Sequence, residues 1–439
     1  MRPLAVLLLA LLALGCRDGL TRPAPTGAAS AAPSPSAVPS GERARLRATN
    51  VQGVPLHPEE RAAAVSGRLP DGAEVEILAR STDGQWLEVR GKDGTRGWIT
   101  RRYLAGAGPA PASPAGVSPS TDSPWSSRAA CEKALSEGRR LERPDGVARF
   151  GTWNVRWFPD GKPGKGQEGK GTDLAWLACA IAWSNVDALA VQEFKTTERA
   201  MQALAEVRRA LDRHTGGSWE AAFDDCPNRD SQHVGVLYDG KRVKARAPTT
   251  LAALNPHGEP CKNSLRPGLA LYVTLPGGLD LHFVSVHAKS GTERRSLELR
   301  DKSLSALGEA DKALQALVQD RDVLLAGDFN TMGCKDCSPP VSADEELGRA
   351  DGVLGRQGYR RVAAEKPCSE YHDGRGTLLD HFVASSSFAE LPKQARVVVS
   401  GICGDTSCAV GPAAGPGAAQ RELSDHCPLF LDIPDRDLD

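Results

Sequence analysis

Short apolar runs that end in polar residues recur along the chain from about Cys131 to the C-terminus. Apolar runs of about four to eight residues are typical of buried strands. Strands are therefore predicted at residues 149–155, 187–191, 234–238, 269–275, 281–286, 323–326, 378–384 and 428–433. Apolar residues at helical spacing predict helices around residues 174–181, 204–211 and 297–307. Alternating strands and helices predict two sheets, or one large sheet, with helices covering the faces.

Residues 43–105 show another pattern, in which apolar and polar residues alternate as they do in half-buried strands. Such segments occur at residues 74–78, 86–89 and 97–99. Asp93-Gly94 is typical of a hairpin turn, and Trp86 and Trp98 stand on either side of it. This pattern resembles the bacterial SH3 domain. The resemblance implies a small β-barrel that binds cell-wall or peptide material; the alternative is that both tryptophans serve only its core.

The N-terminus has the features of an export signal. Arg2 precedes an apolar run over residues 4–14, which is too short to span a bilayer but suits the core of a signal peptide. The run ends in Ala-Leu-Gly-Cys16, which resembles a bacterial lipobox. We therefore predict a signal peptide at residues 1–16 and a lipid anchor on Cys16 that holds the exported protein to a bacterial membrane in the cell envelope. The alternative is an ordinary secretory signal.

Two segments rich in alanine, proline and serine separate these parts, at residues 17–42 and 106–130. They have no periodic apolar pattern, so we predict flexible linkers.

The cysteine content supports export. The chain has 11 cysteines, and those other than Cys16 make an even number, enough for five disulfides in an oxidising compartment. Cys334-x-x-Cys337 could be half a zinc site or a redox pair, but no second Cys-x-x-Cys accompanies it, so we predict a structural disulfide. Cys403 and Cys408 are expected to close a loop in the same way.

Charge excludes little. The 439 residues carry a formal net charge of -1, so there is no excess of basic residues that would indicate a nucleic-acid partner. A local basic groove would not show in that total.

Polar residues follow or interrupt several predicted strands, at positions where a core residue would be apolar. They are Asn154, Gln192-Glu193, His287, Asp328-x-Asn330, Asp380-His381 and Ser424-Asp425-His426. A single carboxylate at the end of a strand means little, because Asp and Asn also favour turns. Successive strand ends with oxygens and imidazoles predict one rim at which a metal and a phosphate could lie.

The ordered set resembles the endonuclease/exonuclease/phosphatase superfamily and, within it, deoxyribonuclease I. The motifs are Trp153-Asn154-Val155-Arg156, Val191-Gln192-Glu193, Val286-His287, Gly327-Asp328-Phe329-Asn330, Asp380 and Ser424-Asp425-His426-Cys427-Pro428. The resemblance implies an α+β fold, a four-layer α/β/β/α sandwich, for residues 131–439.

The resemblance also implies roles. Asn154, Glu193 and Asp425 would hold Mg²⁺, with Mn²⁺ as the alternative, because hard divalent cations prefer oxygen ligands. Asp328 and Asn330 would position the attacking water and the phosphate. His426 would be the general base, oriented by Asp380. His287 would be a general acid or a donor to the phosphate.

Two further positions belong to this comparison. Arg266 matches an arginine that grips a phosphate in the family, and the alternative is a surface arginine before a strand. In deoxyribonuclease I a glutamate pairs with the general-acid histidine, whereas Gln232 stands at the corresponding place here. An amide can orient an imidazole but cannot stabilise its charged form, which counts against His287 as a strong acid.

The sequence therefore predicts an exported, metal-dependent phosphodiesterase, with an endonuclease acting on DNA or RNA as the leading hypothesis. Lys162, Lys165 and Lys170 could contact a nucleic-acid backbone. Two alternatives stay open. One is a phosphatase or a lipid phosphodiesterase of the same superfamily, similar to sphingomyelinases or inositol-phosphate phosphatases. The other is a cell-envelope binding protein without catalysis.

Overall fold

The computed structural model describes residues 36–37, 42–46, 53–59, 65–81, 86–100, 103–105, 123–161, 171–372, 375–405, 408 and 417–438. The predicted signal peptide with Cys16, most of both predicted linkers, and Lys162, Lys165 and Lys170 lie outside these residues. The chain divides into two compact units, residues 1–60 with 66–105, and the rest. No helix among the described residues is both long and apolar enough to cross a membrane.

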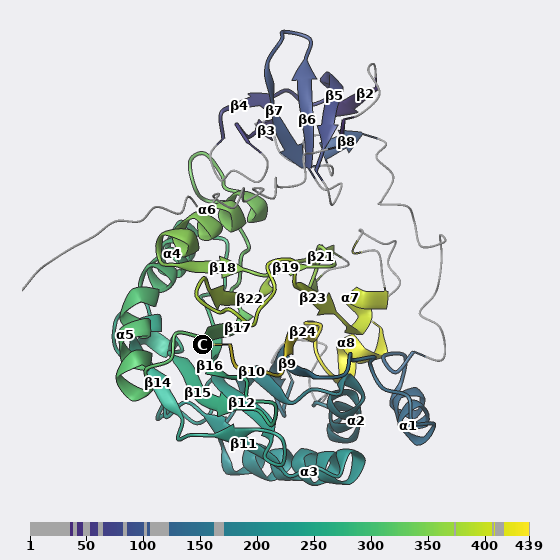
Figure 1. Cartoon of the computed structure of the whole chain (residues 1–439), viewed down its shortest axis with the longest axis vertical. Helices are drawn as coiled ribbons and strands as arrows, with labels where there is room; N and C mark the ends of the chain where they lie inside the picture. Colours follow the sequence, from purple (N-terminus) through teal and green to yellow (C-terminus); the bar gives the residue numbers. More distant parts are fainter. Residues whose placement is uncertain are drawn as a thin grey trace, which may run out of the picture. The chain divides into compact units, whose positions relative to one another are not determined.

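The small unit is built from antiparallel strands (Figure 1). Its main sheet has the order β7-β6-β5-β2-β8, β1 pairs with β5, and β3 pairs with β4. The strands are β1 (Ser36–Ala37), β2 (Arg43–Leu46), β3 (Val54–Leu56), β4 (Gly67–Leu69), β5 (Glu74–Arg80), β6 (Trp86–Gly91), β7 (Arg96–Thr100) and β8 (Leu104–Ala105). In β5, buried Val75 and Ile77 alternate with more exposed glutamates, as the sequence pattern predicts.

The large unit contains two seven-stranded sheets. The first sheet has the order β11-β12-β10-β9-β24-β23-β19. Its strands are β9 (Val147–Phe158), β10 (Ala188–Phe194), β11 (Trp219–Phe223), β12 (His233–Asp239), β19 (Ala363–Ala364), β23 (Arg396–Val399) and β24 (Leu429–Pro434).

The second sheet has the order β13-β15-β16-β17-β22-β18, with β14 paired to β15. Its strands are β13 (Lys244–Ala245), β14 (Thr249–Leu251), β15 (Gly268–Thr274), β16 (Asp280–His287), β17 (Val323–Asp328), β18 (Tyr359–Arg361) and β22 (Asp380–Ser385). A separate hairpin joins β20 (Glu370–His372) to β21 (Arg375–Thr377).

The two sheets pack face to face, and helices cover both outer faces (Figure 1). The inner core contains Phe150 of β9 and Phe283 of β16, whose rings lie 5.0 Å apart. On the first sheet lie α1 (Arg128–Ser136), α2 (Leu174–Ser184), α3 (Glu198–Thr215) and α8 (Ala418–Glu422). On the second lie α4 (Arg294–Ser305), α5 (Leu307–Leu317) and α6 (Ala343–Arg356), while α7 (Gly401–Asp405) follows β23. The predicted four-layer sandwich is confirmed.

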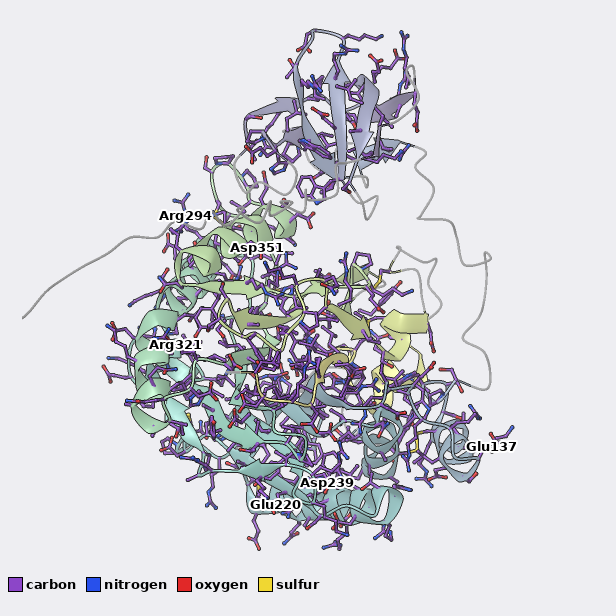
Figure 2. The ribbon with its side chains drawn as sticks, in the orientation of Figure 1. Glu137, Glu220, Asp239, Arg294, Arg321 and Asp351 are labelled. Atoms are coloured by element: carbon purple, nitrogen blue, oxygen red, sulfur yellow. A yellow bond between two sulfur atoms is a disulfide. The ribbon has the colours of Figure 1, made fainter. Side chains whose placement is uncertain are left out.

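Several charged residues mark the outside of the large unit. Glu137, Glu220 and Arg294 are exposed and lie at the periphery of the large unit (Figure 2). Two 3-10 helices, Ala252–Leu254 and Lys262–Ser264, lie in the connection that leads to β15.

Each predicted strand of the large unit is present, within a few residues of its predicted ends. One helix prediction is wrong: residues 297–307 belong to two helices, which meet at Ala306. Both helices contact the 3-10 helix Ala252–Leu254, and α4 also packs against α6. The apolar spacing was continuous across the break and did not reveal it.

All cysteines of the large unit are paired, which confirms five disulfides. The pairs are Cys131–Cys179, Cys226–Cys261, Cys334–Cys337, Cys368–Cys408 and Cys403–Cys427. Cys334 and Cys337 bond to each other, as predicted. Cys403 and Cys408 do not close a loop in that way, because each bonds to a cysteine elsewhere in the chain. Five disulfides indicate an extracytoplasmic, oxidising compartment.

Candidate active site

Strand alternation carries the polar residues of the second sheet to the face between the two sheets. In β16, β17 and β22 the residues Phe283, Leu324 and Phe382 point into the inner core. An even number of positions separates each of these residues from a polar residue of the same strand, which therefore lies on the same face. The polar residues are His287, Asp328 and Asp380. Strand pairing sets His287 opposite Asp328 and Asp328 opposite Asp380. The three side chains thus form a row across three neighbouring strands.

The first sheet contributes Asn154 by the same alternation, and Glu193 by a bulge. The pairing of β10 with both neighbours shifts between Gln192 and Phe194. Glu193 is the extra residue and has a left-handed backbone, with φ 64°. A bulge redirects a side chain and is frequent beside active sites. As a result, the Glu193 carboxylate turns toward Asn154, whose Nδ2 lies 3.2 Å from its Oε1.

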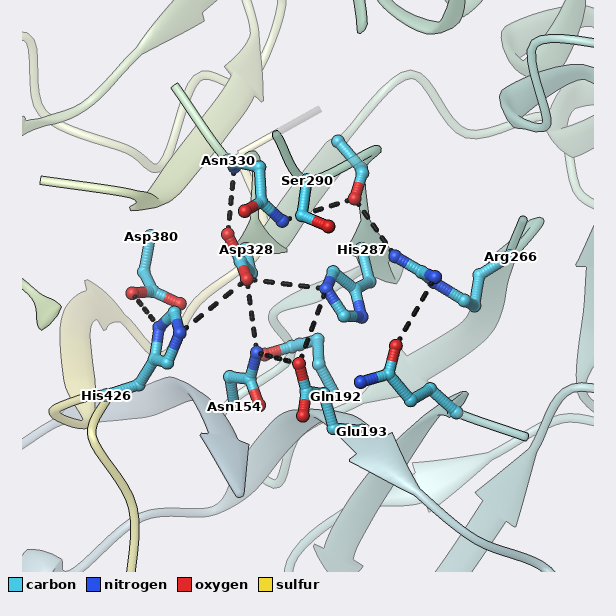
Figure 3. Close-up of polar contacts among 12 residues, drawn as sticks. Asn154, Gln192, Glu193, Arg266, His287, Ser290, Asp328, Asn330, Asp380 and His426 are labelled. Atoms are coloured by element: carbon cyan, nitrogen blue, oxygen red, sulfur yellow. Dashed lines mark hydrogen bonds and ion pairs between the residues drawn. The ribbon is translucent and has the colours of Figure 1, made fainter. Parts of the chain in front are cut away.

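Asp328 occupies the centre of the cluster (Figure 3). Its Oδ2 accepts a hydrogen bond from Asn154 Nδ2 at 3.1 Å, and its Oδ1 accepts one from the Asn330 backbone at 2.8 Å. The preceding Gly327 is required by packing, since a Cβ there would lie 1.9 Å from the Val286 carbonyl oxygen. Burial and the nearby Asp380 and Glu193 carboxylates raise the pKa of Asp328 to about 7.

His426 and Asp380 form a pair, with Nδ1 of the imidazole 2.9 Å from Oδ2 of the carboxylate. The other ring nitrogen of His426 lies 3.8 Å from Asp328 Oδ2. Burial opposes the charged imidazole, yet Asp380 and Asp328 together raise the pKa of His426 well above its usual range. A base is therefore held between two acids, with one nitrogen facing the centre of the site.

His287 lies on the other side of Asp328. Its Nε2 is 3.4 Å from Asp328 Oδ2 and 3.9 Å from Glu193 Oε1. Its buried Nδ1 has no hydrogen-bond partner among the described residues. Burial and the positive charge of Arg266 hold the pKa of His287 well below its usual range. The imidazole is thus neutral near pH 7 and is a poor general acid.

Gln232 does not take the orienting place beside His287 that the sequence suggested. Its Oε1 lies 3.4 Å from a guanidinium nitrogen of Arg266. That arginine also donates to the Ala288 backbone oxygen at 3.0 Å. Arg266 is therefore beside His287 rather than on a remote surface (Figure 3). Asn330 Nδ2 reaches the same Ala288 oxygen, at 3.2 Å.

Two other histidines that stood near these motifs lie elsewhere. His233 is buried and pairs with Asp224 at 2.7 Å. His381 points to the outer side of its sheet, where its Nε2 lies 3.1 Å from Thr331 Oγ1. Both have local partners that satisfy them.

Asp425 is half-buried beside His426. Loss of hydration raises the pKa of Glu193, and the charge of Asp425 adds to this rise. Glu370 is a further carboxylate at the site that sequence reasoning missed. It is 7% exposed, and its backbone bridges to that of His426. Burial raises its pKa to about 8. Glu370 belongs to the short β20–β21 hairpin. The sequence there has no alternating apolar pattern from which a strand end could be predicted, so it gives no indication that Glu370 lies at the site.

The donor set fits a hard divalent cation. Asp328, Asp380 and His426 offer ligand atoms within 4.8 Å of one another, and Glu193 with Asn154 adjoins them. Three carboxyl groups at this place have raised pKa values, namely the half-buried Glu193 and the buried Asp328 and Glu370. Buried acids repel one another, and a cation between them relieves both the repulsion and the lost hydration.

The two units are similar to different known proteins. The model of the bacterial SH3 domain matches residues 60–105. These residues form a bacterial SH3 domain. In this SH3 domain Trp98 is 9% exposed and serves the core, whereas Trp86 is half-buried and meets the ring of His57 edge-on at 5.1 Å. No curated protein sequence is significantly similar to the chain.

Several solved structures are similar to the large unit. One is an endonuclease/exonuclease/phosphatase family protein from Bacteroides thetaiotaomicron, with 15% identity, 65% of this chain and 94% of that chain covered, and a TM-score of 0.45. A mannosyl-6-phosphatase from the same species has 15% identity, 65% and 99% coverage, and a TM-score of 0.44. TDP2 from D. rerio, in complex with a single-strand DNA product, has 16% identity, 66% and 99% coverage, and a TM-score of 0.44.

Proposed function

We propose that the large unit is a divalent-metal-dependent hydrolase of phosphate esters, of the endonuclease/exonuclease/phosphatase type, and that it cleaves phosphodiester bonds in DNA or RNA. The observation that carries this proposal is the row His287–Asp328–Asp380. Asn154 and Glu193 close it from the opposite sheet, and His426 closes it from the segment before β24. A base, several oxygen ligands and an arginine converge there on one buried point.

Phosphate-ester hydrolysis needs three things that these residues supply. Negative charge on the phosphoryl oxygens must be stabilised, a water must lose a proton, and the ester oxygen must leave. Glu193, Asn154 and Asp425 would hold Mg²⁺ or Mn²⁺. That cation would neutralise charge on the phosphoryl oxygens.

The residues of the chain carry the proton steps. The raised pKa leaves only the deprotonated form of His426 able to act as the base; this form takes the proton of the attacking water at Nε2. Asp380 at Nδ1 holds the ring and stabilises the imidazolium. Asp328 and Asn330 orient that water, and the neutral His287 donates a hydrogen bond to a phosphoryl oxygen through Nε2. Arg266 binds a second phosphoryl oxygen. The new P–O bond forms as the ester P–O bond breaks, and the released oxygen is protonated from solvent.

The test is nicking of supercoiled plasmid by the purified protein with Mg²⁺ or Mn²⁺, with and without EDTA. His426→Ala controls for contaminating nuclease. We expect nicking that needs the metal and is lost in the variant. Metal-dependent release of phosphate or phosphocholine without nicking would keep the reaction and move the substrate to sugar phosphates or lipids. No hydrolysis of any of these would overturn the enzyme and favour a cell-envelope binding protein.

We propose for the N-terminal part that Cys16 carries a lipid anchor and that the SH3 domain binds a cell-wall or peptide ligand. The export that the disulfides indicate supports both ideas. Mass spectrometry of the mature N-terminal peptide tests the first, and Cys16→Ala should release the protein from membranes. Co-sedimentation of the protein with purified peptidoglycan tests the second.

A further inference from the structure

The segment before α1 belongs to the core of the large unit, although its composition predicted the end of a linker at residues 106–130. Trp125 is 4% exposed. Its ring meets the rings of Trp153 at 5.9 Å and Trp183 at 5.8 Å, in both cases edge to face. The Pro124 carbonyl oxygen accepts a hydrogen bond from Trp176 Nε1 at 3.0 Å. The chain is thus anchored at this point by packing and by hydrogen bonding.

Trp153 connects this anchor to the candidate base. Its indole Nε1 donates a hydrogen bond of 3.0 Å to the backbone oxygen of His426. The backbone nitrogen of His426 donates to Ser424 Oγ at 3.1 Å, and that hydroxyl donates to the Asn154 backbone oxygen at 2.6 Å. The peptide groups of His426 are therefore held from β9 by the indole of Trp153 and, through Ser424, by Asn154, in addition to the backbone bridge to Glu370.

A small, partly open pocket adjoins this support. It has a volume of about 10 Å³ and lies between Trp125, Trp153 and the segment from Leu423 to Pro428. Removing the Trp125 side chain would remove its edge-to-face contact with Trp153 and enlarge this pocket beside the His426 segment. Side chains around such a void relax into it only in part, and the ones that relax move. The first residue to gain freedom would be Trp153.

We propose that Trp125 is a positioning residue for His426 and acts through the indole of Trp153. This inference rests on the proposed function in so far as His426 is the base. Trp125 itself touches no reacting atom. Its contribution is to hold the ring whose N–H fixes the His426 carbonyl, and through it the 3.8 Å approach of His426 Nε2 to Asp328.

The experiment compares Trp125→Ala and Trp125→Phe with wild type in the full protein. The first readout is hydrolysis of bis(p-nitrophenyl) phosphate with Mn²⁺. The second, which needs no activity, is the rate of hydrogen exchange of the Trp153 indole N–H, assigned with Trp153→Phe. A displacement of about 1 Å can cost a hundredfold in rate. We therefore expect kcat of Trp125→Ala to fall about tenfold to a hundredfold, with KM changed less than about twofold.

The indole exchange should accelerate at least about tenfold in Trp125→Ala, because the His426 carbonyl then holds it less well. Trp125→Phe should restore both readouts toward wild type. Trp219→Ala is the matched control. Trp219 lies on the far strand β11 and is 2% exposed in the same core, and its indole donates a hydrogen bond of 3.0 Å to Thr215. It should lower stability without changing the exchange of Trp153.

The proposal is overturned if Trp125→Ala changes kcat and the Trp153 exchange no more than Trp219→Ala does. If Trp125→Ala does not fold, Trp125→Leu takes its place, with an intermediate effect expected on both readouts. A wild-type protein that hydrolyses no phosphate ester would refute the proposed function alone. The exchange of the Trp153 indole would then still decide whether Trp125 holds the His426 segment.

Discussion

Oδ2 of Asp380 lies 2.9 Å from Nδ1 of His426 and also accepts a hydrogen bond of 2.7 Å from Ser369 Oγ. The same hydroxyl accepts the backbone N–H groups of Leu379 and Asp380, at 2.9 and 2.8 Å. The carboxylate is therefore fixed before it meets the imidazole. A carboxylate fixed in this way sets both the tautomer and the charge of the ring.

Asp380→Asn should preserve the fold and lower kcat about 10²- to 10⁴-fold with little change in KM. The amide cannot stabilise an imidazolium and would favour the wrong tautomer of His426. The measurement is steady-state hydrolysis of a chromogenic phosphodiester. Ser369→Ala is the graded comparison and should cost about tenfold, because the carboxylate keeps its charge and loses only one partner. Equal losses in both variants would mean that placement, rather than charge, is the contribution of Asp380.

Glu193→Gln should abolish the stabilisation of the protein by Mg²⁺ or Mn²⁺. A cation present at about 100 times its Kd adds about 2.7 kcal/mol to the free energy of unfolding, and chelation removes this gain. Thermal unfolding with metal and with EDTA measures it. Glu298→Gln, an exposed position on α4, should retain the full metal-dependent shift. A metal shift that survives in Glu193→Gln would place the cation with other ligands.

Glu370 should make the metal-free protein less stable as pH rises from about 5 to 8. Its folded pKa, about 8, is above that of the unfolded chain, so the folded state holds a proton that the unfolded state has released. The penalty grows by about 1.4 kcal/mol per pH unit at most. Glu370→Gln should therefore be more stable than wild type at pH 8 and nearly equal to it at pH 4. Urea unfolding in EDTA at several pH values measures this.

The outcome that contradicts this expectation is a stability difference between Glu370→Gln and wild type that does not change with pH. Glu298→Gln serves again as the exposed control and should follow wild type throughout.

Arg300→Met should destabilise the fold by about 3–5 kcal/mol, because it leaves a buried carboxylate unpaired. Arg300 and Glu346 are 2% and 3% exposed and 2.5 Å apart. Glu346 Oε2 also accepts the Gly333 backbone N–H at 2.6 Å, so the pair supports the loop that follows Asn330. The double variant Arg300→Met with Glu346→Leu should be more stable than Arg300→Met alone. Denaturant unfolding of both variants tests this, and a double variant that is the less stable would refute it.

The local sequence pattern was enough to predict most of the helices and strands and much of the row of polar residues at the site. A strand alternates its side chains, so the apolar residues of β16, β17 and β22 already determine which face His287, Asp328 and Asp380 share. The even number of remaining cysteines likewise anticipated five disulfides. Such features depend on neighbours along the chain, and neighbours are what a sequence displays.

Other features arise only when distant segments meet. Ser424 binds the backbone of Asn154 across 270 residues, and no local pattern records that encounter. Other features depend on similar encounters between distant segments. They are the partner of Gln232, the disulfide partners of Cys403 and Cys408, the position of the Glu370 carboxylate and the burial of Trp125. The amino-acid sequence by itself determined which residues could do chemistry and on which face of each strand they lie. The tertiary structure decided which of them stand within bonding distance, because strand pairing and sheet packing, unlike periodicity, join segments that are far apart in the chain.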